Sequence, residues 1–377
     1  MKNRIISNKK SALLASAISA IILTGCGGGS GGTSDFSPPP STSGQESSQQ
    51  QLQGAAVKGP LTGAAISVYV LDPTAPGLKG ELVASGVTDS TAAIDSVVLP
   101  SSVTAADGFF ERVFLVEAVG GEEVGSNLPA VINSLQGIVT GLQYSRDFPV
   151  YVTPLTTLAL ELAVNMKQQN PAIEFLDLLN GSGLEINGAV ALNAVQTVKA
   201  IFGLGLIDDV NLFIDAPLLG VNASGQIIAN TQKTVNHRIV IETLGAIVES
   251  LKIPSGTTDG SLLIASLAED LADGGIDGAG ANGNIALLSA IGNLNDLITA
   301  DPDTLLIPNT NKPISQLASV IFEEAAMTVP GLNVGSLATP VINDLDNPVA
   351  STQDTDGDGV PDGADVFPFN RFESADT

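Results

Sequence analysis

Five aspartates near the C-terminus have the residue type and spacing that bind a divalent cation. Within residues 354–365 they occupy positions one, three, five, nine and twelve, and a glycine at position six allows a sharp turn. Ca²⁺ prefers six to eight oxygen ligands, and the main-chain carbonyl at position seven supplies one more. The sequence therefore predicts Ca²⁺ as the cofactor, with the ligands Asp354, Asp356, Asp358, Val360 (carbonyl), Asp362 and Asp365. The other interpretation is an acidic tail that binds no metal.

The spacing is close to that of the EF-hand loop, with Asp365 in place of the bidentate glutamate. No amphipathic helix flanks the loop, and Pro361 and Phe367-Pro368 argue against one. The Asp-x-Asp-x-Asp-Gly-x-x-Asp-x-x-Asp run resembles the thrombospondin type 3 repeat, although the usual cysteine of that repeat is absent. The resemblance implies that residues 346–377 form a short calcium-binding repeat.

Cys26, the only cysteine, follows an apolar run over residues 12–23. Four basic residues precede the run: Lys2, Arg4, Lys9 and Lys10. This order is typical of a secretory signal peptide, whereas a transmembrane helix needs about 20 uninterrupted apolar residues. Leu23-Thr24-Gly25-Cys26 resembles the lipobox of bacterial lipoproteins. The resemblance implies cleavage after a signal peptide of residues 1–25 and lipidation of Cys26, with palmitate among the acyl groups.

Residues 26–54 are predicted to be a lipid-anchored linker, because they are rich in Gly, Ser, Pro and Gln and poor in apolar side chains. Gly27 and Gly28 after the cysteine resemble lipoproteins that are sent to the outer membrane. We therefore expect a lipid anchor in the outer membrane, on either its periplasmic or its surface face.

Acidic residues outnumber basic ones by 40 to 15, which gives a formal net charge of −25. Loss of residues 1–25 would remove four basic residues and no acidic ones, which would make the chain more acidic still. Such a chain repels nucleic acid and anionic membranes, so we expect no nucleic-acid partner and a membrane contact made by the lipid. The absence of Trp lowers the expectation of a sugar site built on stacked rings.

The fold class that we predict is multidomain: a small all-β sandwich, an all-α domain, then the calcium loop. In residues 55–150 the apolar side chains alternate, with strands expected at 66–70, 80–87 and 109–119. Gly59–Ala64 followed by an alternating strand resembles transthyretin-like or immunoglobulin-like modules, which are usually spacers or adhesive surfaces.

In residues 151–345 the apolar period is helical. Thr153 is expected to cap the first helix and Pro154 to occupy its first turn. Apolar faces predict helices at 155–166, 192–202, 240–251, 263–271, 287–298 and 314–321. Residues 153–158 also resemble a junction between a sandwich and a helical module in secreted proteins.

Few residues outside the calcium loop suggest chemistry. His237 is the only histidine, and its apolar surroundings predict a partly buried packing or capping role. Asp270, Asp273 and Asp277 around Gly274-Gly275 form a candidate second cation site, and the other interpretation is a helix end with solvated aspartates. A hydrolase that uses only carboxylates needs no sequence signature and stays an open alternative.

We therefore expect no enzymatic activity, and a calcium-binding envelope protein that acts as a binding, adhesion or accessory module. The alternative is a carrier of apolar ligands such as fatty acids or hydrocarbons, because apolar helix faces can enclose a cavity. Its partners would be an outer-membrane channel or a surface protein.

Overall fold

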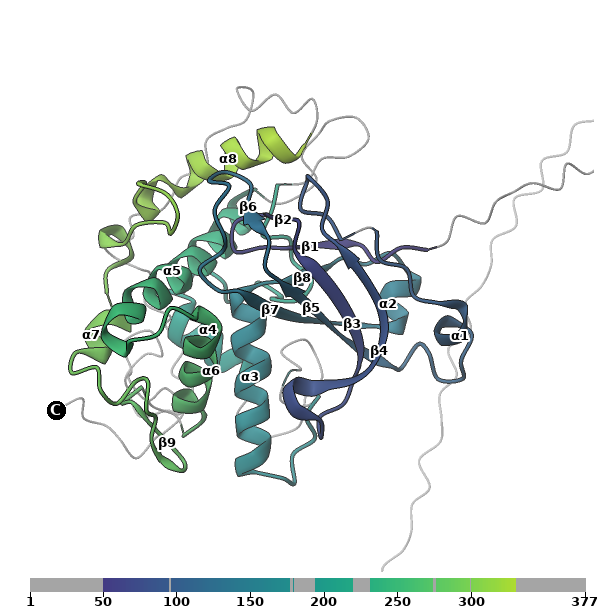
Figure 1. The fold of residues 1–377 in the computed structure, drawn as a ribbon, viewed down its shortest axis with the longest axis horizontal. Coiled ribbons are helices and arrows are strands. Elements are labelled where there is room, and N and C mark those ends of the chain that lie inside the picture. The colour runs from purple at the N-terminus through teal and green to yellow at the C-terminus, as the bar shows by residue number, and fades with distance from the viewer. Residues whose placement is uncertain are drawn as a thin grey trace, which may run out of the picture. The chain divides into compact units, whose positions relative to one another are not determined.

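An antiparallel sheet of four strands organises the N-terminal half of the described chain (Figure 1). The structure, a computed structural model, describes residues 50–329 except 95, 177–178, 180–193, 220–230, 274–275 and 299. The strand order is β4-β3-β5-β7. The bounds are β3 Ala65–Leu71, β4 Lys79–Val87, β5 Val113–Val119 and β7 Ser134–Thr140.

The alternating pattern predicted β3 and β4 correctly. The next strand begins at Val113 rather than Phe109, because the chain turns first: the Arg112 N–H donates to the carbonyls of Gly108 and Phe109. Phe109 is buried and packs edge-on against Tyr144. Its apolar side chain therefore belongs to the core without belonging to the strand.

Shorter strands pair outside the main sheet. β1 (Gly54–Ala56) pairs in parallel with β8 (Val150–Val152), and β2 (Leu61–Thr62) pairs antiparallel with β6 (Glu122–Glu123). A further two-stranded pair, β9 (Ala279–Gly280) and β10 (Gly283–Asn284), lies in the region expected to be helical. The described chain thus has mixed β-sheets and several helices, and it does not confirm an all-β sandwich followed by an all-α domain.

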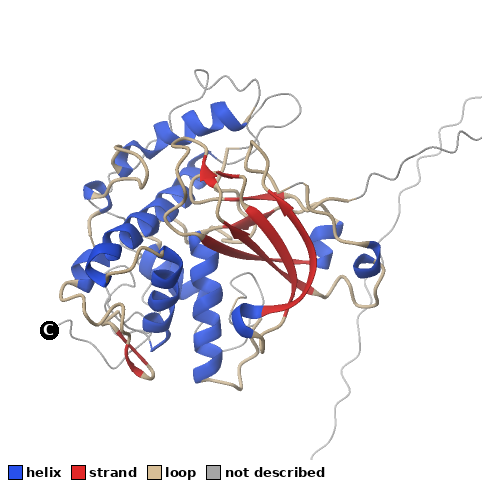
Figure 2. Ribbon diagram, in the orientation of Figure 1, coloured by secondary structure: helices blue, strands red, loops and turns tan. Residues whose placement is uncertain are grey.

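Helices dominate after residue 153 (Figure 2). The α-helices are α1 Ser101–Thr104, α2 Gly141–Ser145, α3 Pro154–Gln169, α4 Ala194–Phe202, α5 Thr231–Ser255, α6 Gly260–Asp270, α7 Leu294–Ile298 and α8 Leu317–Thr328. Short 3-10 turns are η1 Pro76–Leu78, η2 Leu271–Asp273, η3 Pro302–Thr304 and η4 Ile314–Gln316. The helix expected at 287–298 forms only as α7, because Gly292 weakens a helix by about 1 kcal/mol.

Threonines join the start of α3 to β7. The Thr153 hydroxyl accepts from the Thr156 N–H at 3.1 Å, and the Thr156 hydroxyl accepts from the Thr153 N–H at 2.8 Å, which makes a reciprocal capping box. The Gln136 N–H in β7 donates to the Thr157 hydroxyl at 2.8 Å. The predicted cap is confirmed, and the same short segment fastens the helix to the sheet.

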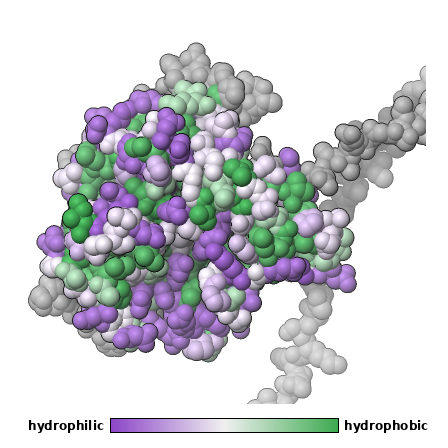
Figure 3. Space-filling model, viewed as in Figure 1, coloured by the Kyte–Doolittle hydropathy of each residue, from purple (hydrophilic) through white to green (hydrophobic). Residues whose placement is uncertain are grey.

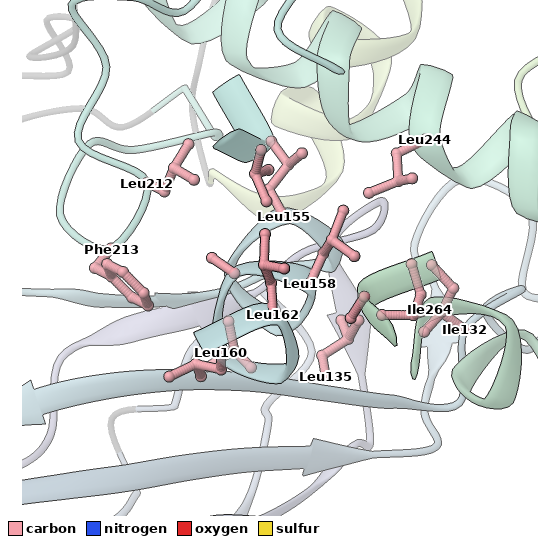
Figure 4. Packing of buried hydrophobic residues seen from close by; sticks show 14 of the residues in the cluster. Ile132, Leu135, Leu155, Leu158, Leu160, Leu162, Leu212, Phe213, Leu244 and Ile264 are labelled. Atoms are coloured by element: carbon pink, nitrogen blue, oxygen red, sulfur yellow. The ribbon is translucent and has the colours of Figure 1, made fainter. Parts of the chain in front are cut away.

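The buried apolar side chains of the strands and of α3, α4, α5 and α6 form one continuous cluster. Helix α3 contacts β7 on one side and α4, α5 and α6 on others, so it lies between the sheet and the other helices (Figure 1). Leu155, Leu158 and Leu162 of α3 point toward neighbouring side chains such as Leu244 and Leu135 (Figure 4). A smaller cluster, which includes Ile239, Leu317 and Ile321, joins α8 to α5.

On the face drawn in Figure 3, hydrophilic and hydrophobic residues are interspersed. Within the described ranges, none of the helices combines the length and the apolar character needed to cross a bilayer.

Candidate functional site

The two strongest sites predicted from the sequence lie outside the described residues. They are the lipidation site and the calcium loop, comprising Cys26, Asp354, Asp356, Asp358, Val360, Asp362 and Asp365. The signal peptide, the linker up to residue 49 and the tail from residue 330 also lie outside them.

His237 is completely buried in α5, more deeply than the sequence suggested. Burial lowers the pKa of its imidazole to about 4, and the nearby Asp215 only partly opposes this effect. Neither ring nitrogen makes a hydrogen bond of ordinary geometry within the described part of the chain. A neutral imidazole without access to solvent is poorly placed for general-base catalysis.

Asp270, at the end of α6, is buried and organises the turn that follows. Its carboxylate accepts from the Gly278 N–H at 3.1 Å and from the Asp277 N–H at 3.3 Å. Burial raises the pKa of Asp270 to about 7, although these two hydrogen bonds favour the ionised form and oppose the shift. The Asp277 carboxylate accepts from the Ala279 N–H at 2.8 Å. Over the described ranges, no group of three or more His, Cys, Asp or Glu side chains is arranged to hold a metal ion, so Asp270, Asp273 and Asp277 are not gathered into such a group.

A buried network of five charged side chains was not predicted from the sequence. Lys58 Nζ lies 3.1 Å from Glu123 Oε1 and 3.0 Å from Glu242 Oε2. Arg238 contacts Glu242 at 2.9 Å and Glu324 at 2.9 Å. Glu242 of α5 therefore bridges both cations, and the network joins residue 58 and β6 to α5 and α8.

Two glycines leave room for this network. A Cβ at Gly245 in α5 would lie 2.7 Å from Lys58 Cε, closer than real side chains approach. A Cβ at Gly59 would lie 3.2 Å from Glu123 Cγ, and Gly59 has a positive φ of 72° that favours glycine. The lysine side chain thus reaches the interior through space that larger residues would fill.

The network holds three carboxylates but only two cations. Burial raises the pKa of Glu123 to about 7, although Lys58 opposes the shift and Glu242 adds to it. Burial also raises the pKa of Glu324 despite its contact with Arg238. Burial works against the charged form of Lys58, but Glu242 and Glu123 outweigh it and raise the pKa of the ammonium. A proton on Glu123 would leave two cations facing two anions.

All five side chains have exposed fractions of 7% or less, which leaves little room for water or substrate. Breaking a buried ion pair costs about 3–5 kcal/mol, because the remaining partner stays desolvated. These charges therefore serve to hold strands and helices together, and the arrangement gives no support to a carboxylate-based hydrolase at this place.

A pocket against the main sheet is a candidate site for a ligand. We call it the sheet-face pocket; its volume is about 340 Å³. The register of β5 and β7 places Val113 opposite Thr140, and Ile138 two residues before Thr140 on the same face. Apolar lining residues include Val113, Ile138, Leu179, Val195, Val210 and Phe213. Phe213 lies at the edge of the side-chain cluster in Figure 4.

The polar side of the pocket centres on Lys199 of α4. Other polar lining residues are Thr140, Gln143, Asp208, Asp209 and Asn211. Lys199 has an exposed fraction of only 6%, and its ammonium donates to the Asp208 carbonyl at 2.9 Å. Burial lowers the pKa of Lys199, while Asp208 and Asp209 oppose the shift. The pocket therefore combines an apolar wall with one buried cation.

The wall that carries Asp208 and Asp209 is attached to α5. Lys233 of α5 donates to the Asp209 carbonyl at 2.8 Å and forms an ion pair with Asp215 at 2.7 Å. The Asn236 amide donates to the Leu206 carbonyl at 3.2 Å. Residues 206–215, which follow α4, are thus held by side chains from both helices.

Comparison with protein-family models, with curated proteins and with solved structures finds no match to this chain.

Proposed function

We propose that this chain is a non-catalytic, calcium-binding protein of the cell envelope, held to the outer membrane by a lipid on Cys26. In this proposal residues 50–329 act as a binding, adhesion or accessory module. The sequence supports the anchor through the lipobox-like Leu23-Thr24-Gly25-Cys26 and the metal through the aspartates of residues 354–365.

The observation that carries the non-catalytic part is how the buried ionisable groups are used. In the interior, Lys58 and Arg238 form ion pairs with three carboxylates, those of Glu123, Glu242 and Glu324. Asp270 accepts from backbone N–H groups, and His237 is enclosed with a pKa of about 4. These groups are enclosed within the fold, which suits a module that binds a partner without transforming it.

The anchor is tested with Cys26→Ser in cells that express the full chain. We expect the wild type to incorporate labelled palmitate and to fractionate with outer membranes, and the variant to lose both properties. Ser30→Ala, four residues further on, is the matched control. A Cys26→Ser protein that is still labelled and membrane-bound would contradict the anchor.

The metal is tested by calorimetric titration of Ca²⁺ into the purified protein without residues 1–25. We expect binding in the millimolar to submillimolar range of extracellular modules. Asp358→Asn should weaken binding at least tenfold, because it removes one charged ligand at position five. Asp376→Asn, outside the loop, should bind as the wild type does; equal binding by all three proteins would refute the site.

We also propose that the fold divides into a sandwich-like part over residues 55–150 and a helical part over residues 151–345. The support is that the strands of the main sheet precede residue 150 and the longer helices follow it. Hydrogen exchange of the whole protein tests it. Two domains should open with two distinct free energies, whereas one shared value would indicate a single cooperative unit.

The carrier of apolar ligands is the second candidate, and the sheet-face pocket is the observation that favours it. Its volume of about 340 Å³ lies at the lower end of the 300–1,000 Å³ typical of ligand sites. Native mass spectrometry of protein released from cells is the test. A co-purified small molecule that is lost in Val113→Phe, a variant that fills the pocket, would support the carrier. A wild type that shows only the mass of its bare chain would oppose it.

A further inference from the structure

Lys199 is unusual among the lysines of the described chain because it is nine-tenths buried and lines a pocket. An ammonium can donate three hydrogen bonds, and the structure shows one, to the Asp208 carbonyl at 2.9 Å. A buried ammonium that keeps spare donors beside an apolar wall is costly unless another acceptor completes its shell. Among the described residues, the Lys199 ammonium thus keeps donors for an acceptor that enters the pocket.

We propose that the sheet-face pocket binds an apolar monocarboxylate of medium chain length, with Lys199 donating hydrogen bonds to its carboxylate. This inference rests on the carrier function above and narrows its ligand. The apolar tail would lie against Val113, Ile138 and Phe213, which form the wall built by β5, β7 and the segment after α4.

The charges around the pocket select among head groups. Asp208 and Asp209 are exposed at the pocket lining, and Asp215 is paired with Lys233 at 2.7 Å. A dianionic phosphate would meet one lysine and at least two carboxylates, which is unfavourable. A plain hydrocarbon would displace water from the Lys199 ammonium without offering a hydrogen-bond acceptor in its place. A single carboxylate matches the single buried cation and forms charge-assisted hydrogen bonds.

The volume of the pocket limits the tail. About 340 Å³ accommodates one small ligand and excludes a whole membrane phospholipid. A ligand that lies wholly within the pocket is therefore a free acid and not part of an intact phospholipid.

Lys199 also has a structural role, because its bond to the Asp208 carbonyl fixes the chain after α4. The variants must separate this role from ligand binding. Lys199→Gln keeps an amide donor for that carbonyl and removes the charge, whereas Lys199→Met removes both. Lys252→Met is the matched control, because Lys252 of α5 forms a surface pair with Glu249 at 2.9 Å and does not line this pocket.

The experiment is calorimetric titration of the purified protein, without residues 1–25, with decanoate and with 1-decanol at pH 7.5. Urea unfolding of each variant accompanies it. We expect the wild type and Lys252→Met to prefer decanoate. Lys199→Gln should lose at least tenfold in decanoate affinity with little change for decanol, and Val113→Phe should weaken both ligands.

Each other outcome overturns a distinct statement. Equal binding of decanoate and decanol by the wild type and Lys199→Gln would overturn the carboxylate and leave an apolar carrier. Binding that survives in Val113→Phe would overturn the location. No binding of either ligand to stable wild-type protein would overturn this inference, while a small molecule seen by native mass spectrometry would still support the carrier.

Discussion

Replacement of Glu123 by Gln tests the excess carboxylate of the buried network. The pKa of Glu123 is about 7 in the folded chain, against an ordinary value of 4.5. The folded state therefore holds this proton more tightly than the unfolded state does. Its contribution to stability is greatest below pH 4.5 and is lost as the pH rises toward and past 7.

The size of this effect follows from the two pKa values. A tenfold difference in proton affinity corresponds to about 1.4 kcal/mol. The change from 4.5 to about 7 thus makes the wild type lose about 3 kcal/mol of unfolding free energy between pH 4.5 and pH 8 through Glu123. Glutamine is neutral at every pH and retains an oxygen that can accept from Lys58. Glu123→Gln should therefore match the wild type near pH 5 and exceed it at pH 8.

The assay is urea unfolding at half-unit intervals from pH 5 to pH 8, with the stability of the variant subtracted from that of the wild type. Subtraction cancels the other groups with shifted pKa values, such as Asp270 and His237. Glu122→Gln is the control, because Glu122 is the exposed neighbour of Glu123 in β6. A wild type and a Glu123→Gln variant with parallel pH profiles would refute the reasoning.

Two further predictions concern stability. Glu242→Gln removes the carboxylate shared by Lys58 and Arg238 and should lower the free energy of unfolding in urea by about 3–5 kcal/mol. Glu249→Gln, on the exposed face of the same helix, should change stability little. Equal losses in the two variants would show that the shared carboxylate contributes no more than a surface pair. Thr153→Ala removes the hydroxyl that caps α3 and should lower the free energy of unfolding by about 1–2 kcal/mol in the same assay. Thr153→Ser retains the acceptor and is the control. A serine variant as unstable as the alanine variant would mean that the methyl group of Thr153, and not the cap, stabilises the fold.

Local patterns predicted those elements whose signals lie within a few residues. The alternation of Ile66, Val68 and Val70 marks β3, and Thr153-Pro154 marks the start of α3. Both signals reflect short-range geometry, namely the period of a strand and the free N–H groups at a helix start. The helix expected at 240–251 covers only the more apolar part of α5, because α5 begins at Thr231.

The first turns of α5, before residue 240, were missed because buried polar side chains interrupt the apolar pattern of Val235 and Ile239. His237, Arg238 and Glu242 are almost fully buried, although their types favour the surface. Arg238 and Glu242 at a spacing of four are typical of an exposed helical pair. Only the distant Lys58 and Glu324 make the interior position tolerable, and no local pattern links residues so far apart in the chain. The sheet-face pocket was missed for the same reason, since β5, β7 and α4 form it together.

Helix α5 connects the two features that the sequence did not reveal. Its Arg238 and Glu242 take part in the charge network, while its Lys233 and Asn236 hold the chain segment that lines the pocket. Residues 233–242 span less than three helical turns, so a shift of this helix would move both sites together. The network fixes α5 against α8 directly and against β6 by way of Lys58, through pairs whose rupture costs several kcal/mol. Because α5 is held firmly, the pocket wall attached to it is already in position before a ligand binds. This preorganisation reduces the free-energy cost of ordering the site on binding.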